Sequence, residues 1–153
     1  MSDTLSLKVE LHKHCHQYIG DKMAIIESAL ASITESRDNE TKSSVGDKYE
    51  TGRAMMQLEE EKYRAQLANA LQSRNTLDRI DPTRLRTVAE AGSLVETDRG
   101  WYYLAIAIGK VQLSEQTFFV ISTDAPIGRL LLQKKVGDQV AFQGKQLLIL
   151  NIS

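Results

Sequence analysis

The three histidines and the single cysteine of the chain lie within the run His12-Lys-His-Cys-His16. On a helix, His12 and His16 share one face at the i, i+4 spacing that can chelate zinc or copper. No second cluster elsewhere in the sequence supplies the remaining ligands. Two interpretations therefore stand beside each other: a metal site, or a solvated histidine face next to a Cys15 that belongs to an apolar seam. We expect no metal or cofactor of the protein's own.

Acidic residues form a second set of candidates, namely Asp38, Glu40, Asp47 and Glu50. Asp47 follows Ser44 by three residues, which is where the carboxylate of a capping box stabilises a helix N-terminus. Asp38 and Glu40 lie among turn-forming residues, and turn chemistry explains them as well as a functional role does. Carboxylates are also hard oxygen ligands for divalent metals, so a metal-facing role is the competing interpretation.

The composition fits a folded protein of one domain or two small ones, with 153 residues, 42% apolar and 25% charged. The net charge of −1 does not favour binding to free nucleic acid. We expect a cytoplasmic protein, because one cysteine forms no internal disulfide and neither a signal peptide nor a membrane span of roughly 20 apolar residues is present. No nucleophile and base pattern, phosphate loop or paired zinc motif indicates a free-standing enzyme.

Two long helices must position these groups. Apolar residues recur at three- and four-residue steps from about Thr4 to Ser36 and again up to about Arg79, and Ile80-Asp-Pro82 ends the pattern. The expected apolar face is Leu11, Cys15, Tyr18, Ile25, Ile26, Ala29, Leu30 and Ile33 in the first helix, and Tyr49, Met56, Tyr63, Leu67, Ala70, Leu71 and Leu77 in the second.

A polar turn joins the two helices, so they should form an antiparallel coiled-coil hairpin over residues 1–80 with its tip near 36–46. At ~1.5 Å per residue, helices of about 30 residues make an arm of about 45 Å. Lys22, Glu60 and Arg74 interrupt the seam between the helices, which makes it narrower than the core of a globular bundle.

After a linker at 81–86, the pattern over residues 87–153 predicts a small antiparallel β-sheet domain with one short helix. Pro126 to Leu132 should be that helix, with Asp124 as its cap. The expected fold class is therefore α+β. The predicted strands are Ser93 to Glu96, Trp101 to Ile108, Thr117 to Ser122, Val140 to Phe142 and Gln146 to Ile152, and the apolar run WYYLAIAI favours a central strand covered on both faces.

The segment Ile121-Ser-Thr-Asp-Ala-Pro-Ile-Gly-Arg-Leu-Leu-Leu-Gln-Lys-Lys-Val-Gly-Asp138 resembles the C-terminal signature of the GreA/GreB transcription elongation factors. That signature is a strand ending in a Ser-plus-acidic turn, a helix opened by Ser-Pro-(Ile/Leu)-Gly-Arg, and a Lys-x-Gly-Asp turn. The resemblance is dense over residues 117–152, including the ending Leu-Leu-Ile-Leu-Asn-Ile. It weakens over 87–116, and over 1–79 it is architectural apart from Tyr49 and the charged helix that follows.

This resemblance implies an FKBP-like C-terminal domain that docks on bacterial RNA polymerase, with Ser122, Asp124 and Pro126 as the docking turn. It also implies a coiled coil that enters the secondary channel, where tip acids share a magnesium ion with the polymerase active site and promote RNA cleavage. The partner is then RNA polymerase, with nucleic acid met only within that complex and no membrane, and a monomer is expected. Local chemistry alone also explains the turn as a cap followed by a first-turn proline.

The tip departs from the family pattern Gly-Asp-Leu-(Ser/Lys)-Glu-Asn-Ala-Glu-Tyr. When the family's tyrosine is aligned on Tyr49, Lys42 and Val45 occupy the positions of the two key acids. Lysine is a cation and valine has no ligand oxygen, so cleavage is not expected to be strong unless a differently shaped turn presents Asp38 and Glu40, or Asp47 and Glu50.

Two other functions compete with the polymerase role. The hairpin could clamp a different partner as a folding helper or scaffold. With an FKBP-like fold, Trp101, Tyr102 and Tyr103 could line a peptide pocket like that of a prolyl isomerase, but aromatic residues in strands are more often core and fold alone does not confer activity.

Overall fold

In the computed structural model, the backbone is described for residues 2–40 and 46–153, and the side chains for residues 3–39 and 51–153. The chain forms two compact units: one contains residues 17–74, and the other contains residues 1–16 together with 75–153. The unit that holds the β-sheet therefore also includes residues 1–16 and 75–80, which the sequence pattern assigned to the hairpin. Among the described residues, no helix is long and apolar enough to cross a membrane.

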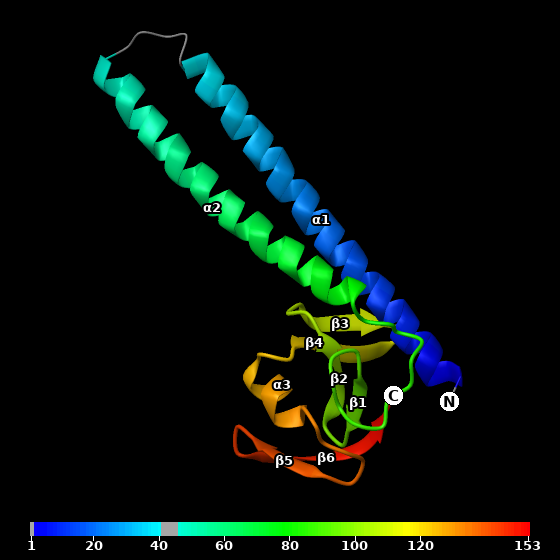
Figure 1. Ribbon diagram of the computed structural model, residues 1–153. Helices are drawn as coiled ribbons and strands as arrows, with labels where there is room; N and C mark the ends of the chain where they lie inside the picture. The colour runs from blue at the N-terminus through cyan, green and yellow to red at the C-terminus, as the bar shows by residue number, and fades with distance from the viewer. Residues whose placement is uncertain (1, 41–45) are drawn as a thin grey trace. The chain divides into compact units, whose positions relative to one another are not determined.

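Two long helices are present, α1 at Ser2–Glu40 and α2 at Gly46–Asp78. Within residues 17–74 they lie side by side and run in opposite directions, as Figure 1 shows. Helix α1 continues past Ser36, the end that the sequence predicted, because residues 36–40 are polar but contain neither glycine nor proline. Both helices that the apolar pattern predicted are confirmed.

The buried stripe of the hairpin is slightly rotated from the predicted one. Its apolar members on α1 are Ile19, Met23, Ile26 and Ile33, which recur at three-, four- and seven-residue steps and fit one helix face. Tyr18 and Ile25 are instead exposed, so their assignment to the seam was wrong. The helical period of the apolar residues was predicted correctly, but the apolar residues of α1 fit more than one helix face. Neighbouring positions on a helix point about 100° apart, so a shift by one residue selects a different face.

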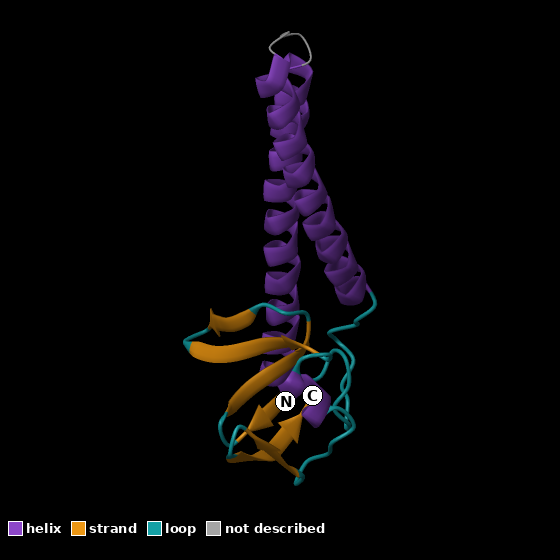
Figure 2. Ribbon diagram, turned by 90° about the vertical axis from the view of Figure 1, so that its left-hand side faces the viewer, coloured by secondary structure: helices purple, strands orange, loops and turns teal. Residues whose placement is uncertain are grey.

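The sheet has six strands: β1 Leu94–Thr97, β2 Gly100–Ala105, β3 Gly109–Leu113, β4 Gln116–Ser122, β5 Gln139–Phe142 and β6 Lys145–Ile152. Their order is β3-β4-β2-β1-β6-β5, which makes β2 an interior strand, as the run WYYLAIAI predicted. Figure 2 shows these strands twisted with respect to one another, as expected for a sheet of L-residues.

One pair of strands corrects the expectation of a purely antiparallel sheet. Strands β2 and β4 are parallel, with Tyr102 opposite Phe119. Strand β3, which the sequence pattern missed, forms the edge hairpin with β4 and lets the chain return to pair with β2 in the same direction. The segment Gly109–Leu113 was missed because only two of its five residues are apolar.

The core lies on one face of this sheet under the short helix α3, which spans Pro126–Leu131 and buries Ile127 and Leu131. The other members of that cluster are Ala89, Val95, Leu104, Val140, Leu147, Ile149 and Ile152. Residues 1–16 contribute Leu11 and Cys15, which are both fully buried. The α+β class, a helical hairpin followed by a mostly antiparallel sheet with a short helix, is confirmed.

Candidate functional site

The turn between β4 and α3 brings together the three predicted partner-binding residues. The backbone N–H of Asp124 donates to the Oγ of Ser122 at 3.1 Å, and the N–H of Ala125 donates to the Ser122 carbonyl oxygen at 3.1 Å. Pro126 is the first residue of the helix, as predicted. Asp124 is not the helix cap, however, because the N-cap is Ala125 and no side chain caps the helix. Ser122 orders the turn instead.

A close backbone approach fixes this turn. A Cβ added to Gly128 would lie 2.2 Å from the carbonyl oxygen of Ser122 and 3.1 Å from the Cα of Thr123. Real Cβ atoms do not approach that closely, so only glycine lets the first turn of α3 lie against the end of β4. The Ser-to-Gly spacing of the motif is therefore a packing requirement of the turn.

The outer surface of the turn is open to solvent. Asp124 and Pro126 are exposed, Arg129 is exposed on the same helix, and Leu130 is 38% exposed. A rigid turn that offers a carboxylate, a proline ring and a leucine side chain is suited to contact a partner surface. The sequence did not single out Leu130, because it lies in a run of three leucines and only the packing of α3 shows which of them faces outward.

The tip acids are only partly within the described residues. Asp38 is exposed on the last turn of α1. The side chains of Glu40, Asp47 and Glu50, together with residues Lys42 and Val45, lie outside the described part. Among the described residues, no group of three or more histidine, cysteine, aspartate or glutamate side chains could hold a metal ion.

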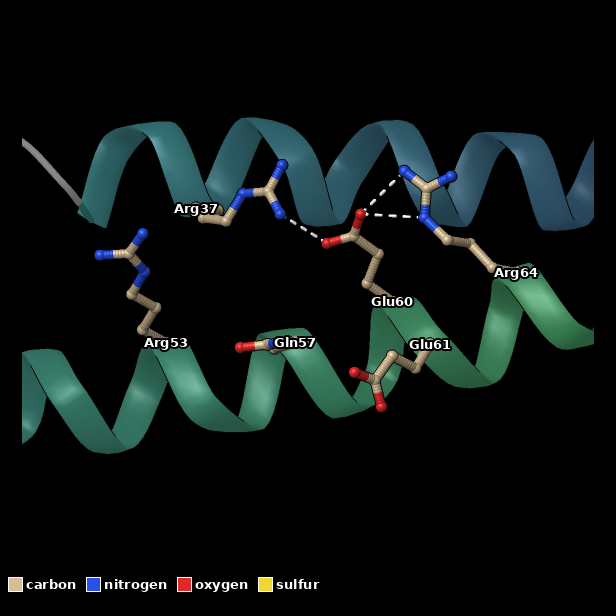
Figure 3. A pocket seen from close by; sticks show the side chains of 6 residues that line it. All are labelled: Arg37, Arg53, Gln57, Glu60, Glu61 and Arg64. Carbon is tan, nitrogen blue, oxygen red and sulfur yellow. Dashed lines mark hydrogen bonds and ion pairs between the residues drawn. The ribbon is translucent and has the colours of Figure 1, made fainter.

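A cluster of charged side chains lies between the helices of the hairpin, lining a cleft of about 400 Å³ (Figure 3). The Glu60 carboxylate accepts from Arg37 Nη1 at 2.5 Å, and from Arg64 Nε and Nη2 at 3.0 and 2.8 Å. Figure 3 shows Arg53 reaching from α2 towards α1 beside this network. The sequence indicated Glu60 only as an interruption of the apolar seam; its partner Arg37 is 23 residues away and could not be assigned.

The hydrogen bonds and charges of this cluster change the pKa of Glu60. The hydrogen bond from Arg64, and then the charge of Arg37, hold the pKa of the Glu60 carboxyl below its usual value. A carboxylate whose two oxygens both accept hydrogen bonds from guanidinium groups is a weak base. The cluster joins the two helices by ion pairs and shows no catalytic arrangement.

The histidine run lies in the unit that contains the sheet. His12 is buried, and its Nδ1 lies 2.8 Å from the hydroxyl of the fully buried Tyr103. Burial, and then the charge of His16, lower the pKa of His12. Burial raises the pKa of the Cys15 thiol to about 12, which makes it a packing residue and a poor nucleophile. Of the proposed aromatic pocket, Tyr103 is therefore core, while Trp101 and Tyr102 are half-buried.

Two buried cations stabilise the connection that precedes the sheet. Lys8 is fully buried and donates from Nζ to the carbonyl oxygen of Arg84 at 2.8 Å. Burial, and then the charge of Arg86, lower the pKa of Lys8 to about 8. Arg86 itself donates to the carbonyl oxygens of Arg84 and Gly92, both at 3.0 Å. No local sequence pattern could predict this pairing, because Lys8 and Arg84 are 76 residues apart.

Comparison with solved structures gives likenesses in fold. A solved structure described as that of the transcription factor Gfh1 is similar with a TM-score of 0.35 and 17% sequence identity, over 89% of this chain and 91% of that one. No protein-family model and no curated protein matches the chain. At that TM-score the likeness carries no information about partners or activity, so function must be inferred from the residues themselves.

Proposed function

We propose that this chain is a binding protein of bacterial RNA polymerase that modulates transcript elongation and has no enzymatic activity of its own. The observation that carries the proposal is the turn from Ser122 to Gly128. Its sequence resembles the Gre signature, Gly128 leaves no room for a Cβ beside the Ser122 carbonyl oxygen, and Asp124 and Pro126 are exposed to solvent. A closely packed turn with an exposed carboxylate and an exposed proline is suited to docking on a partner.

The hairpin formed by α1 and α2 is the second part of the proposal. Within the Gre resemblance, it enters the secondary channel of the polymerase. In the alignment that the Gre resemblance implies, Lys42 and Val45 stand at the positions of the family's two key acids. We therefore propose that the protein occupies the channel and stimulates RNA cleavage weakly or not at all, because a cation near a catalytic metal opposes its retention.

Purified protein mixed with bacterial RNA polymerase tests this proposal by gel filtration. We expect stoichiometric co-elution of the parent protein with the polymerase. We expect loss of co-elution for Asp124→Asn combined with Pro126→Ala, because both side chains are exposed and their replacement leaves the core intact. Separate elution of a well-folded parent protein would contradict the polymerase role.

A second candidate is a scaffold or folding helper that clamps another protein with the hairpin. The observation that favours it is the exposure of apolar side chains on the helices: Ile25 is 69%, Met55 63% and Leu58 67% exposed. A pull-down from bacterial lysate separates the two functions. Stoichiometric polymerase supports the first, and an unrelated partner whose capture is lost with Met55→Gln and Leu58→Gln supports the second.

A further inference from the structure

A cleft of about 440 Å³ opens on the sheet unit, between strands β2 and β4 and the hairpin of β5 and β6. Its size is in the range of sites that accept side chains or small ligands. It shares none of its lining residues with the turn at 122–126. It is therefore separate from the proposed polymerase contact.

The floor of the cleft is aromatic. The rings of Tyr102 and Phe119 stack with centroids 5.5 Å apart and an interplanar angle of 27°. Phe142 and the buried Leu147 also line the cleft. The three aromatic side chains are only partly buried. Partly exposed aromatic groups around a concavity are the usual anchors for an apolar side chain of a partner.

The rim of the cleft is cationic. Arg99 and Lys145 are exposed at its edge. Lys110 is the cross-strand partner of Phe119 and so lies on the same face of the sheet. The one acid of the lining, Asp98, accepts a hydrogen bond at its Oδ1 from the backbone N–H of Leu148 at 2.8 Å. Positive charge is thus in excess around an apolar floor.

A hydrogen bond to the sheet fixes the position of the Arg99 side chain. Its Nε donates to the carbonyl oxygen of Gln146 at 3.1 Å, beside the point where Asp98 binds Leu148. These two side chains hold the start of β6 against the turn between β1 and β2. The terminal nitrogens of Arg99 make no hydrogen bond to another described residue and can meet a carboxylate in the planar geometry that a guanidinium favours.

From this arrangement we propose that the cleft binds an extended acidic peptide segment of a partner protein, with an apolar side chain seated on Tyr102, Phe119 and Phe142 and its carboxylates on Arg99 and Lys145. A peptide fits better than single-stranded RNA, because Tyr102 and Phe119 stack on each other and leave no flat platform for successive bases.

Fluorescence anisotropy with three labelled probes tests the inference on the full-length protein. The first probe is the peptide Glu-Leu-Asp-Phe-Glu with blocked ends, the second is its amide counterpart Gln-Leu-Asn-Phe-Gln, and the third is an RNA oligonucleotide of uridines. We expect the acidic peptide to bind at least about threefold more tightly than its amide counterpart. Rising salt should reduce that preference, since the rim charges are exposed.

Single substitutions test whether the peptide binds in this cleft. Lys145→Gln should weaken binding of the acidic peptide without weakening that of the amide peptide, whereas Tyr102→Leu should weaken both. The matched control is Lys135→Gln, an exposed lysine outside the cleft lining that should leave both unchanged. Far-ultraviolet circular dichroism verifies that each variant is folded. Equal binding of the two peptides, no binding of either, tighter binding of the RNA, or an equal effect of Lys135→Gln would each overturn the inference.

Discussion

Gly128 shows how one residue can be set by backbone packing. The Cβ of an alanine there would lie 2.2 Å from the Ser122 carbonyl oxygen, which belongs to the backbone and has little room to move. We expect Gly128→Ala to lower the free energy of unfolding by about 1–3 kcal/mol, as overpacked sites do. Urea denaturation, monitored by circular dichroism, measures this change in the free energy of unfolding.

Gly20 provides the matched control for that substitution. It lies inside helix α1, and nothing is within 4 Å of the Cβ position. Gly20→Ala should raise the free energy of unfolding by about 0.5–1 kcal/mol, because alanine restricts the unfolded chain and favours the helix. If both substitutions changed stability equally, close packing at Gly128 would not explain the motif.

His12 makes stability depend on pH. Burial, and then His16, lower its pKa in the folded state, with Asp78, Arg86 and Tyr103 as its other neighbours. The unfolded chain therefore binds a proton at a higher pH than the folded one does. Stability conferred by neutral His12 is complete above about pH 6.5 and is lost as the pH falls through that value towards the lower folded pKa.

Urea titrations at about pH 7.5 and about pH 5.5 check this expectation. We expect the parent protein to lose more stability between these two values than His12→Gln does, since glutamine does not titrate. His14→Gln is the control, because His14 is exposed on the same helix and should leave the parent's pH dependence unchanged. A pH dependence that persists undiminished in His12→Gln would remove His12 as its source.

At the scale of elements, the sequence predicted those helices and strands whose signals lie within one short stretch of residues. The two long helices, the interior strand β2 and a short helix beginning at Pro126 followed from periodicity and turn residues. Strand β3 was missed because Gly109, Lys110 and Gln112 leave too few apolar positions, and its pairing with β4 explains why β2 and β4 are parallel. Register and strand direction depend on partners that a single sequence does not identify.

In the candidate site, too, features within one short stretch of sequence were predicted, and contacts between distant residues were not. The turn at Ser122, Asp124 and Pro126 was predicted, because all three residues belong to one short motif. The contacts of Lys8 with Arg84 and of His12 with Tyr103 were not, since they join residues 76 and 91 positions apart. The cap role given to Asp124 failed because Ala125, not Asp124, directly precedes the helix at Pro126, and a proline at the first helical position has no N–H to be capped.

The first sixteen residues should stabilise the sheet unit. Leu11 belongs to the unit of residues 1–16 and 75–153, and its side chain is 0% exposed. Leu11→Ala should therefore lower the free energy of unfolding by about 2–5 kcal/mol. Thermal unfolding read from the near-ultraviolet signal of Trp101 and its neighbouring tyrosines measures the loss in the sheet unit.

Leu58→Ala is the control for this element, since Leu58 is 67% exposed on the hairpin. It should change stability by no more than about 0.5 kcal/mol. An unchanged midpoint of thermal unfolding for Leu11→Ala would mean that residues 1–16 do not stabilise the sheet unit. The predicted assignment of residues 1–80 to the hairpin would then describe the stability of the protein better.

At the scale of the whole molecule, the proposed polymerase role leads to a prediction about the tip sequence. With a stalled, backtracked polymerase complex, we expect the parent protein to give little shortening of the RNA 3′ end. Lys42→Asp combined with Val45→Glu should increase cleavage, because it supplies two oxygen ligands where the family has acids. Strong cleavage by the parent that disappears on removing Asp38, Glu40, Asp47 or Glu50 would contradict the prediction and identify the acting acid.

The affinity for RNA polymerase tests the docking turn most directly. Biolayer interferometry with immobilised bacterial polymerase should give saturable binding of the parent protein, and at least about tenfold weaker binding of Asp124→Asn with Pro126→Ala. Gln139→Ala, an exposed change on β5 away from the turn, should bind like the parent. Equal affinity of the double variant and the parent, with both proteins folded, would contradict docking through this turn, and absence of binding by the parent would contradict the polymerase role itself.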